Sequence, residues 1–433
     1  MITLLLWPLL AFGGTAAGTA IPFGVVCVLH AIVVAPRVEG MLDRSLLLLA
    51  AALLFQLIPL PPSISGFIAP HAAHTRETLA LAPMPRASWH PLTLDVEATA
   101  WAAVELMGVV ALFLAARERF RLHGVRRITR AVAAVGFGVS LLAVAQAATS
   151  GRAIYWAFPT PFEGPLPFGP FVNRNHFATW AIMAIPLCAG YIAARADAHH
   201  RPLRHVNTRA RVLDLSDDRT LWLTASITAL LVALVLSLSR SAALGLGLSS
   251  GVTIFLVRRA LHPARVRALL VATVLILGFA VSWADPGAVR ERIAGSADAV
   301  WSGMTIWRET GPIVRDFTAT GTGAGTYEIA MRVYQRSDRS IFFNQAHNHY
   351  LQLAAEGGLL LVLPFVLAAA SFVRNARERL TSDRSGLWWV RVGAACGLGA
   401  VAVQSVLETG LTMSANAALA AVLAAIVVHK REA

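Results

Sequence analysis

Long apolar stretches recur along the whole chain, and they limit its fold more than any other feature. About twelve of them are long enough to cross, or nearly cross, the roughly 30 Å of hydrocarbon in a bilayer. In lipid each such segment must satisfy its own backbone hydrogen bonds, so each is predicted to be a helix. The predicted spans are 3–14, 18–36, 44–62, 98–116, 127–149, 175–194, 220–238, 241–257, 266–283, 357–373, 388–408 and 413–429. The first two can be divided differently, because glycines and Pro22 interrupt a single apolar stretch.

The sequence therefore predicts an all-α polytopic integral membrane protein, and its composition excludes the main soluble alternatives. Only 14% of the 433 residues are charged, whereas a soluble globular chain carries about a quarter. The one lysine is Lys430, near the C-terminus. A phosphate-binding loop that ends in Gly-Lys-Ser/Thr is therefore excluded, and with it ATP hydrolysis by that route.

Basic residues set the predicted orientation. Cytoplasmic loops of membrane proteins are enriched in Lys and Arg. With the N-terminus inside, the loops predicted to be cytoplasmic hold 25 of the 37 basic residues. Both termini are therefore predicted to be cytoplasmic, and topology and anionic lipid explain the net charge of +13. A nucleic-acid partner is not predicted.

The predicted spans divide the chain into three parts. Residues 1–283 hold spans one to nine, 284–350 form a large periplasmic segment with a small helical domain, and 351–433 hold spans ten to twelve. Two further periplasmic loops are predicted. The loop near 63–97 is Pro-rich and suits a lid or a re-entrant turn, and the loop near 150–174 carries aromatic residues typical of a membrane interface.

A polar cluster opens the predicted sixth span: Asn173, Arg174, Asn175 and His176. An arginine, two amides and an imidazole at a helix start, where backbone N–H groups point outward, favour an anionic ligand. The alternative is an N-terminal cap, with Arg174 extending to lipid headgroups.

Arg240 lies in a tight turn between two predicted spans, in the sequence Ser-Leu-Ser-Arg-Ser at 237–241. In the predicted topology this turn is external, so the positive-inside rule does not explain its arginine. An arginine flanked by hydroxyls suits bidentate binding of a phosphate or pyrophosphate. The alternative is an anchor to lipid headgroups.

Two more arginines, Arg308 and Arg315, are seven residues apart on a predicted external helix and share one face. Either is a candidate second phosphate ligand, while Arg315 is equally well explained by a surface ion pair with Asp316. A glycine-rich run follows at 320–326. Such a run lets backbone approach a ligand closely, but without a preceding strand or a lysine it is weak evidence for a nucleotide site.

The last cluster precedes and enters the predicted tenth span, at 345–358. His347 and His349 are two residues apart, so they do not share a helical face and make a poor metal-chelating pair. A single neutral histidine near the membrane surface is instead a suitable general base for a sugar hydroxyl. His349, Gln352 and Glu356 share one face and are candidates to orient the helix or to line a polar cavity.

No metal site is predicted. The three cysteines, Cys27, Cys188 and Cys396, lie inside apolar runs, which argues against a disulfide framework and a Cys-rich zinc site. The external segments contain no Asp-x-Asp pair to bind a divalent cation.

Four stretches, in this order, carry a family resemblance: FVNRNHFA at 171–178, LSLSRSA at 236–242, TGTGAGTYE at 320–328 and HNHYLQLAAEGGLL at 347–360. With them, the chain resembles the bacterial O-antigen ligase and Wzy-type polymerase superfamily, also called the Wzy-C family. The resemblance spans nearly the whole chain. It is carried by the order of the motifs and by the long external loop before the tenth span.

The resemblance implies a metal-independent, inverting glycosyltransferase with a GT-C-like fold and no cofactor, in the bacterial inner membrane. The donor would be a glycan on undecaprenyl pyrophosphate at the periplasmic side. The family's essential histidine matches His347, and its pyrophosphate-binding arginines match Arg240 and Arg308. Asn348 and Tyr350 join the predicted binding residues, together with the cluster at 173–176. His349, Arg315 and Glu356 are second choices.

The acceptor stays open at this point. A ligase uses a sugar of the lipid A core, whereas a polymerase uses a second lipid-linked glycan, with a chain-length regulator as a candidate partner. We favour the polymerase slightly, because the 171–178 stretch is less similar to the lipopolysaccharide ligases. The alternative from another class is a transporter or flippase of a lipid-linked or anionic solute. It requires charges inside the membrane, and the candidates are chiefly Glu105 and Glu408.

Overall fold

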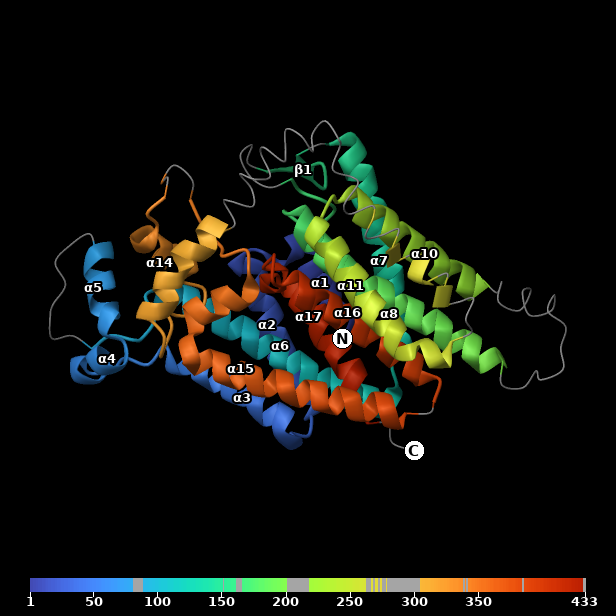
Figure 1. Cartoon of the computed structure of the whole chain (residues 1–433), viewed down its shortest axis with the longest axis horizontal. Helices are drawn as coiled ribbons and strands as arrows, with labels where there is room; N and C mark the ends of the chain where they lie inside the picture. The colour runs from blue at the N-terminus through green and yellow to red at the C-terminus, as the bar shows by residue number, and fades with distance from the viewer. Residues whose placement is uncertain are drawn as a thin grey trace.

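Helices make up nearly all of the secondary structure (Figure 1). The computed structural model describes residues 1–80, 89–150, 152–160, 166–200, 218–261, scattered positions between 266 and 278, 304–337, 339, 342–383 and 385–430. The α-helices are α1 (Ile2–Leu10), α2 (Ala17–Val34), α3 (Gly40–Phe55), α4 (Pro62–Ile68), α5 (Pro70–Leu79), α6 (Val96–His123), α7 (Arg126–Thr149), α8 (Arg174–His200), α10 (Asp218–Leu236), α11 (Arg240–Val257), α14 (Tyr327–Tyr334), α15 (His349–Ser382), α16 (Leu387–Gln404) and α17 (Ser414–Val428). Short elements are the 3-10 turns η1 (Phe12–Gly14), η2 (Arg258–Ala260) and η3 (Gly410–Thr412) and the paired strands β1 (Ala153–Ile154) and β2 (Phe158–Pro159).

Seven of the described helices are long and apolar enough to cross a membrane: α6, α7, α8, α10, α11, α15 and α16. The prediction of an all-α polytopic membrane protein is therefore confirmed. Helices α2 and α17 are apolar but shorter. The predicted span at 266–283 lies mostly outside the described residues, so the count of twelve stays a prediction.

Several predicted boundaries were wrong. Helix α1 has nine residues, which at 1.5 Å per residue is about half of what a span needs. Helix α3 ends at Phe55 rather than at 62, because the prolines that follow cannot continue a helix. Helix α15 begins at His349, eight residues before the predicted start, and α16 ends at Gln404, four residues before the predicted end.

Helix α16 packs closely and antiparallel against both α8 and α11. A side chain at Gly393 would place its Cβ 2.1 Å from the carbonyl oxygen of Pro186 on α8, so only glycine permits this approach. On the other side Ser249 of α11 donates a hydrogen bond of 2.7 Å to the carbonyl of Cys396. Residue numbers rise along α8 and α11 as they fall along α16. The starts of α8 and α11 therefore lie at the same end of the bundle as the end of α16.

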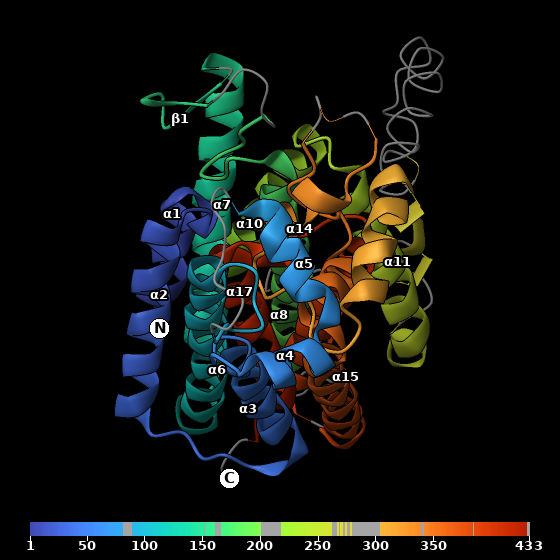
Figure 2. The same ribbon diagram turned by 90° about the vertical axis from the view of Figure 1, so that its left-hand side faces the viewer.

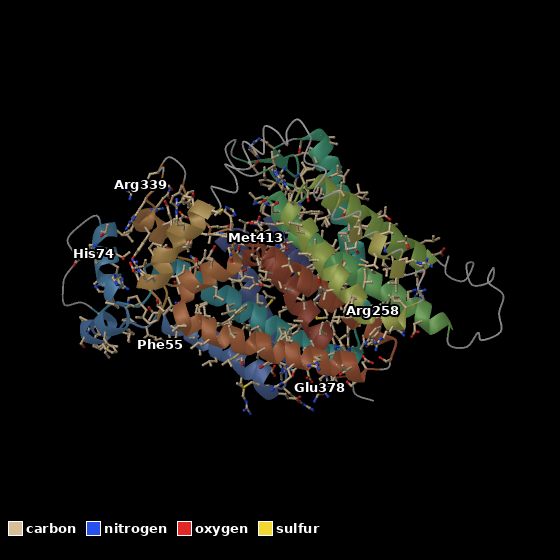
Figure 3. The ribbon with its side chains drawn as sticks, in the orientation of Figure 1. Phe55, His74, Arg258, Arg339, Glu378 and Met413 are labelled. Carbon is tan, nitrogen blue, oxygen red and sulfur yellow. The ribbon has the colours of Figure 1, made fainter. Side chains whose placement is uncertain are left out.

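The bundle has two polar ends, which we call the His347 end and the Arg391 end. Figure 3 labels His74 and Arg339 at the first, and Arg258 and Glu378 at the second. Between them α17 lies in the middle of the helices (Figure 1), and its residues are almost all buried. The charged groups are thus separated by an apolar length of the kind that a bilayer requires.

At the His347 end, two segments far apart in sequence form one apolar cluster. Ala69, Ala72 and Leu92 from the first loop pack with Phe317 and Tyr327 from the later one. Helix α5 contacts α14, and Figure 2 shows α4, α5 and α14 together on the face turned to the viewer. The first predicted loop is therefore two short helices fixed to the segment that precedes His347. Its part at 81–88 lies outside the described residues.

Candidate functional site

Three helix starts and one helix end meet at the His347 end. Gly245 of α11 lies against Ala400 of α16. Because the two helices are antiparallel, Arg240, five residues earlier on α11, is level with Ser405. The carbonyl of Ser405 accepts a 2.8 Å hydrogen bond from the backbone N–H of His349, the first residue of α15. The starts of α8, α11 and α15 thus gather here with their positive dipole ends, which favours anions.

His347 lies just before α15, next to a buried carboxylate. Its Nδ1 is 3.7 Å from Oε1 of Glu408, and its side chain is about half-exposed, whereas that of Glu408 is 5% exposed. The other carboxylate oxygen accepts a 2.7 Å hydrogen bond from Nδ2 of Asn175. The backbone N–H of Thr409 donates to Oε1 at 3.2 Å. Glu408 is therefore fixed from α8 and from its own turn, while the outer side of the imidazole stays accessible.

The two groups shift each other's protonation. The contact with the Glu408 carboxylate raises the pKa of His347 above its ordinary value, although partial burial opposes this. Burial by itself would raise the pKa of Glu408, but the contact with His347, the nearby His176 and the N–H of Thr409 together hold it below its usual range. The lowered pKa of Glu408 favours its ionised form, and the raised pKa of His347 makes its imidazole a stronger base than a free histidine. This is the state that a histidine base oriented by a carboxylate requires.

The backbone of His347 is held in an unusual conformation. Its φ is 47°, a left-handed value that costs energy in a residue other than glycine. The residue before it is fixed at both ends: Gln352 Oε1 accepts from the N–H of Ala346 at 3.2 Å, and Trp307 Nε1 donates to its carbonyl at 3.0 Å. Backbone strain that the surroundings hold in place is typical of functional sites.

The residues of the cluster at 173–176 have different roles: one caps helix α8, and another contacts Glu408. Asn173 Oδ1 accepts a 2.9 Å hydrogen bond from the N–H of Asn175, as an N-terminal cap does. Asn175 binds Glu408 through its side chain. His176 is 5% exposed, and neither ring nitrogen has a hydrogen-bond partner among the described residues. Arg174 is partly exposed at the start of α8.

Asn348 and Tyr350 fix the start of α15. Asn348 Oδ1 accepts a 3.0 Å hydrogen bond from the N–H of Leu351 and caps the helix. The hydroxyl of Tyr350 donates to the carbonyl of Ala402 on α16 at 2.8 Å. The Tyr350 contact and the backbone bond from His349 to Ser405 hold the start of α15 against the end of α16.

The outer arginines are exposed. Arg315 is 2.9 Å from Asp316, and its side chain is 77% exposed, so the predicted surface ion pair is present. Arg308 and Arg240 are also exposed. Within the described ranges, no carboxylate forms an ion pair with either of them. Arg308 follows Trp307, whose indole contacts the residue before His347, so it belongs to the same end of the molecule.

Glu356 has another role. Its carboxylate accepts hydrogen bonds from the backbone N–H groups of Gly325, at 3.0 Å, and Tyr327, at 3.1 Å. A Cβ at Gly321 would lie 2.1 Å from the Glu356 carbonyl oxygen. The glycine-rich run thus approaches the chain's own α15, at a kink where Gly358 has a φ of 50°. These glycines join the outer segment to the helix that starts at the site, and that packing accounts for the close approach of their backbone.

Glu408 was not predicted as a partner of His347 from the sequence. The predicted span 388–408 placed it inside a helix, as a charge for the transport hypothesis. In the structure α16 ends at Gln404, and Glu408 lies in the following turn. The signal was present, since a carboxylate at the edge of an apolar stretch is a functional candidate by default. Within the described part of the chain, no three His, Cys, Asp or Glu side chains gather closely enough to hold a metal ion.

Fold and site together define a multi-pass membrane protein with a histidine–carboxylate pair at one end of its helix bundle. Residues 225–366 match the family model described as O-antigen ligase. The match covers about a third of the chain and supports the resemblance found in the sequence: residues 225–366 are similar to the O-antigen ligase family. The matched range contains Arg240, Arg308 and His347, while Asn175 and Glu408 lie outside it. No curated protein and no solved structure matches the chain.

Proposed function

We propose that the chain is a metal-independent, inverting glycosyltransferase of the bacterial inner membrane. It transfers a glycan from undecaprenyl pyrophosphate to a sugar hydroxyl on the periplasmic side, with both termini in the cytoplasm. The proposal is supported chiefly by the pairing of His347 with the buried Glu408, at the end where three helix starts meet.

In the proposed reaction His347 is the general base. Its Nδ1 faces Glu408, so Nε2 is the nitrogen left to take the proton from the acceptor hydroxyl. The acceptor oxygen forms a bond to the anomeric carbon, and the bond from that carbon to the pyrophosphate oxygen breaks with inversion. Glu408 stabilises the resulting imidazolium, as a carboxylate does in a catalytic triad.

The leaving group carries the developing negative charge. Arg240 is the first residue of α11, so its guanidinium and the helix dipole act at the same end of the helix. Arg308 and Arg174 are the further candidates to bind the pyrophosphate. Fixed positive groups at the place where charge develops lower the barrier more than they strengthen substrate binding.

Two acceptors fit this chemistry. A polymerase transfers the glycan to a second lipid-linked glycan, and a ligase transfers it to a sugar of the lipid A core. Our slight preference for the polymerase comes from the 171–178 stretch, while the matched family description names ligases. The two differ in the acceptor and not in the chemistry at His347.

The test uses purified protein in detergent with an undecaprenyl pyrophosphate-linked oligosaccharide as the only glycan. A ladder of products that disappears in His347→Ala supports a polymerase with His347 as base. Transfer only after addition of a lipid A core acceptor supports a ligase. Full activity of His347→Ala contradicts the proposed base, and absence of product with either acceptor favours the transporter.

One of the two carboxylates on which the transporter hypothesis chiefly depends does not lie within a membrane helix. Glu408 lies outside α16 and contacts His347. The other, Glu105 in α6, accepts a 2.8 Å hydrogen bond from Ser414. A carboxylate bound to a helix start is a packing feature as much as a transport site.

A further inference from the structure

Buried polar atoms without partners gather beneath Glu408. Both ring nitrogens of His176, both amide atoms of Gln404 and Oδ1 of Asn416 lack a hydrogen-bond partner among the described residues. The three residues are only 5%, 2% and 0% exposed. Buried polar side chains normally find partners, either in the protein or in ordered water.

Helix register places two of these residues face to face. Gly397 of α16 lies against Met183 of α8, and the helices are antiparallel. Gln404 follows Gly397 on α16 by seven residues, which is about two turns. His176 precedes Met183 on α8 by the same number. Gln404 and His176 are therefore level on the facing sides of the two helices.

The third residue comes from α17. Nδ2 of Asn416 donates to the backbone carbonyl of His176 at 3.0 Å, and to that of Gly410 at 2.8 Å. This leaves Oδ1 of Asn416 unpartnered, on an amide that is bound to the backbone of His176. Donors and acceptors from α8, α16 and α17 thus meet at one buried place, with the two to four polar groups that an internal water needs.

This place adjoins the reactive pair. Asn175, the residue before His176, donates to the Glu408 carboxylate. The titratable groups that act on Glu408 are His347, from the segment before α15, and His176, from α8. A change beside His176 therefore acts on the protonation of His347 through a single group, the carboxylate of Glu408.

We propose that His176, Gln404 and Asn416 hold ordered water beneath Glu408, and that His176 is a positioning residue that acts on His347 through that carboxylate. The inference about catalysis rests on the proposed function, while the water site stands independently of it. Water held there supplies hydrogen bonds that support the ionised Glu408, and the ionised Glu408 in turn favours protonation of His347.

The first experiment measures the titration of His347 without any glycan. Diethyl pyrocarbonate modifies neutral imidazole, and mass spectrometry gives the rate at His347 against pH in the purified full chain. In His176→Leu the pH midpoint of the modification rate at His347 moves to lower pH, because the ionised Glu408 loses the hydrogen bonds that the water supplies. In Glu408→Gln it moves further in the same direction, and His176→Gln, which still binds water, stays near the wild type.

A matched control comes from the Arg391 end. His429 is also fully buried and has an unpartnered ring nitrogen among the described residues, so His429→Leu leaves the midpoint of His347 unchanged. An unchanged midpoint in His176→Leu, together with a shift in Glu408→Gln, overturns the inference and leaves the proposed function intact. No shift in either variant contradicts the His347–Glu408 pair itself.

A second measurement covers the case in which His176→Leu does not fold. Gln404→Leu removes the amide that faces His176 in the same site, and it also lowers the pH midpoint of the modification rate at His347. In addition, a cryo-EM map that resolves waters shows density bridging His176 and Gln404. A direct contact between these two side chains, with no such density, overturns the water site.

Discussion

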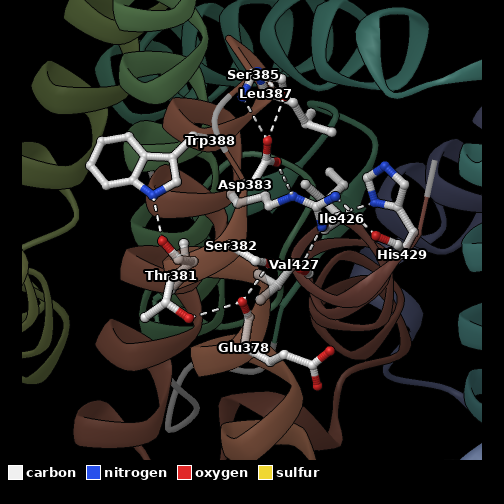
Figure 4. A network of polar contacts seen from close by, with 12 residues as sticks. Glu378, Thr381, Ser382, Asp383, Ser385, Leu387, Trp388, Ile426, Val427 and His429 are labelled. Carbon is white, nitrogen blue, oxygen red and sulfur yellow. Dashed lines mark hydrogen bonds and ion pairs between the residues drawn. The ribbon is translucent and has the colours of Figure 1, made fainter. Parts of the chain in front are cut away.

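The two ends of the bundle each bury a polar network, but only at the Arg391 end does the central charged group have a partner for each of its nitrogens. At the Arg391 end, Nε of Arg391 binds Asp383 at 2.9 Å. Nη1 donates to the carbonyls of Ile426, at 3.0 Å, and Val427, at 2.6 Å, and Nη2 donates to that of His429 at 2.9 Å. Figure 4 shows Asp383 and the end of α17 converging on this centre. A guanidinium 3% exposed thus satisfies the last carbonyls of a buried helix.

The His347 end differs in exposure, backbone conformation and hydrogen bonding. His347 is half-exposed and has a positive φ, and its carboxylate partner borders on buried groups that have no partner among the described residues. A fully satisfied buried network rigidifies a fold, whereas an incomplete one keeps binding capacity at a cost in stability. We therefore expect the Arg391 end to stabilise the fold and the His347 end to carry the proposed chemistry.

The largest expected effect is on activity, from His347→Ala. Without the proposed general base, we expect transfer to fall by about 10²- to 10⁴-fold. The midpoint of thermal unfolding should stay close to that of the wild type, because the side chain is half-exposed. A gel assay of product length and a melting curve on the same preparation check both parts. A fall in stability as large as the fall in activity would remove the contrast between the two ends.

Arg391→Leu should have the opposite profile. Removing one partner of a buried ion pair costs about 3–5 kcal/mol of unfolding free energy, and three carbonyls lose their donor as well. The control is Arg332→Ala, which breaks an exposed pair with Glu328 and should cost less than about 1 kcal/mol. Denaturant unfolding in detergent measures both. Equal effects would show that the Arg391 network does not stabilise the fold.

Arg240→Ala should lower transfer by about a hundredfold, since it removes one group that we propose to stabilise the leaving pyrophosphate. Arg315→Ala is the matched control, because Arg315 is exposed and paired with Asp316. Rates measured at several donor concentrations separate a loss of binding from a loss in the chemical step. A larger loss in Arg315→Ala than in Arg240→Ala would exchange their proposed roles.

The smallest effect is a change in pH dependence. A base works only when neutral, so transfer by the wild type should fall as the pH drops through the raised pKa of His347. In Glu408→Gln that pKa returns toward its ordinary value, and the acidic limb moves to lower pH. A profile of kcat/KM against pH gives the comparison. An acidic limb that stays in place would mean that Glu408 does not set the protonation of His347.

How far the sequence predicted this arrangement depends on the range of the interactions involved. Apolar length alone located seven membrane helices, because each span must satisfy its own backbone. The candidates His347 and Asn175 were also visible as local motifs. Their common partner, Glu408, was not, because it lies 61 residues beyond His347 and 233 beyond Asn175. The packing of glycines between α8 and α16 and the backbone bond from His349 to Ser405 set that register, and a single sequence reveals neither contact.

The most direct test of the account compares His347→Ala with Arg391→Leu, with transfer expressed per amount of folded protein. We expect His347→Ala to fold like the wild type and to transfer almost nothing. Arg391→Leu should give little folded protein, but that protein should transfer at close to the wild-type rate. Wild-type transfer by folded His347→Ala, or loss of transfer in folded Arg391→Leu, would contradict the assignment of chemistry to the His347 end.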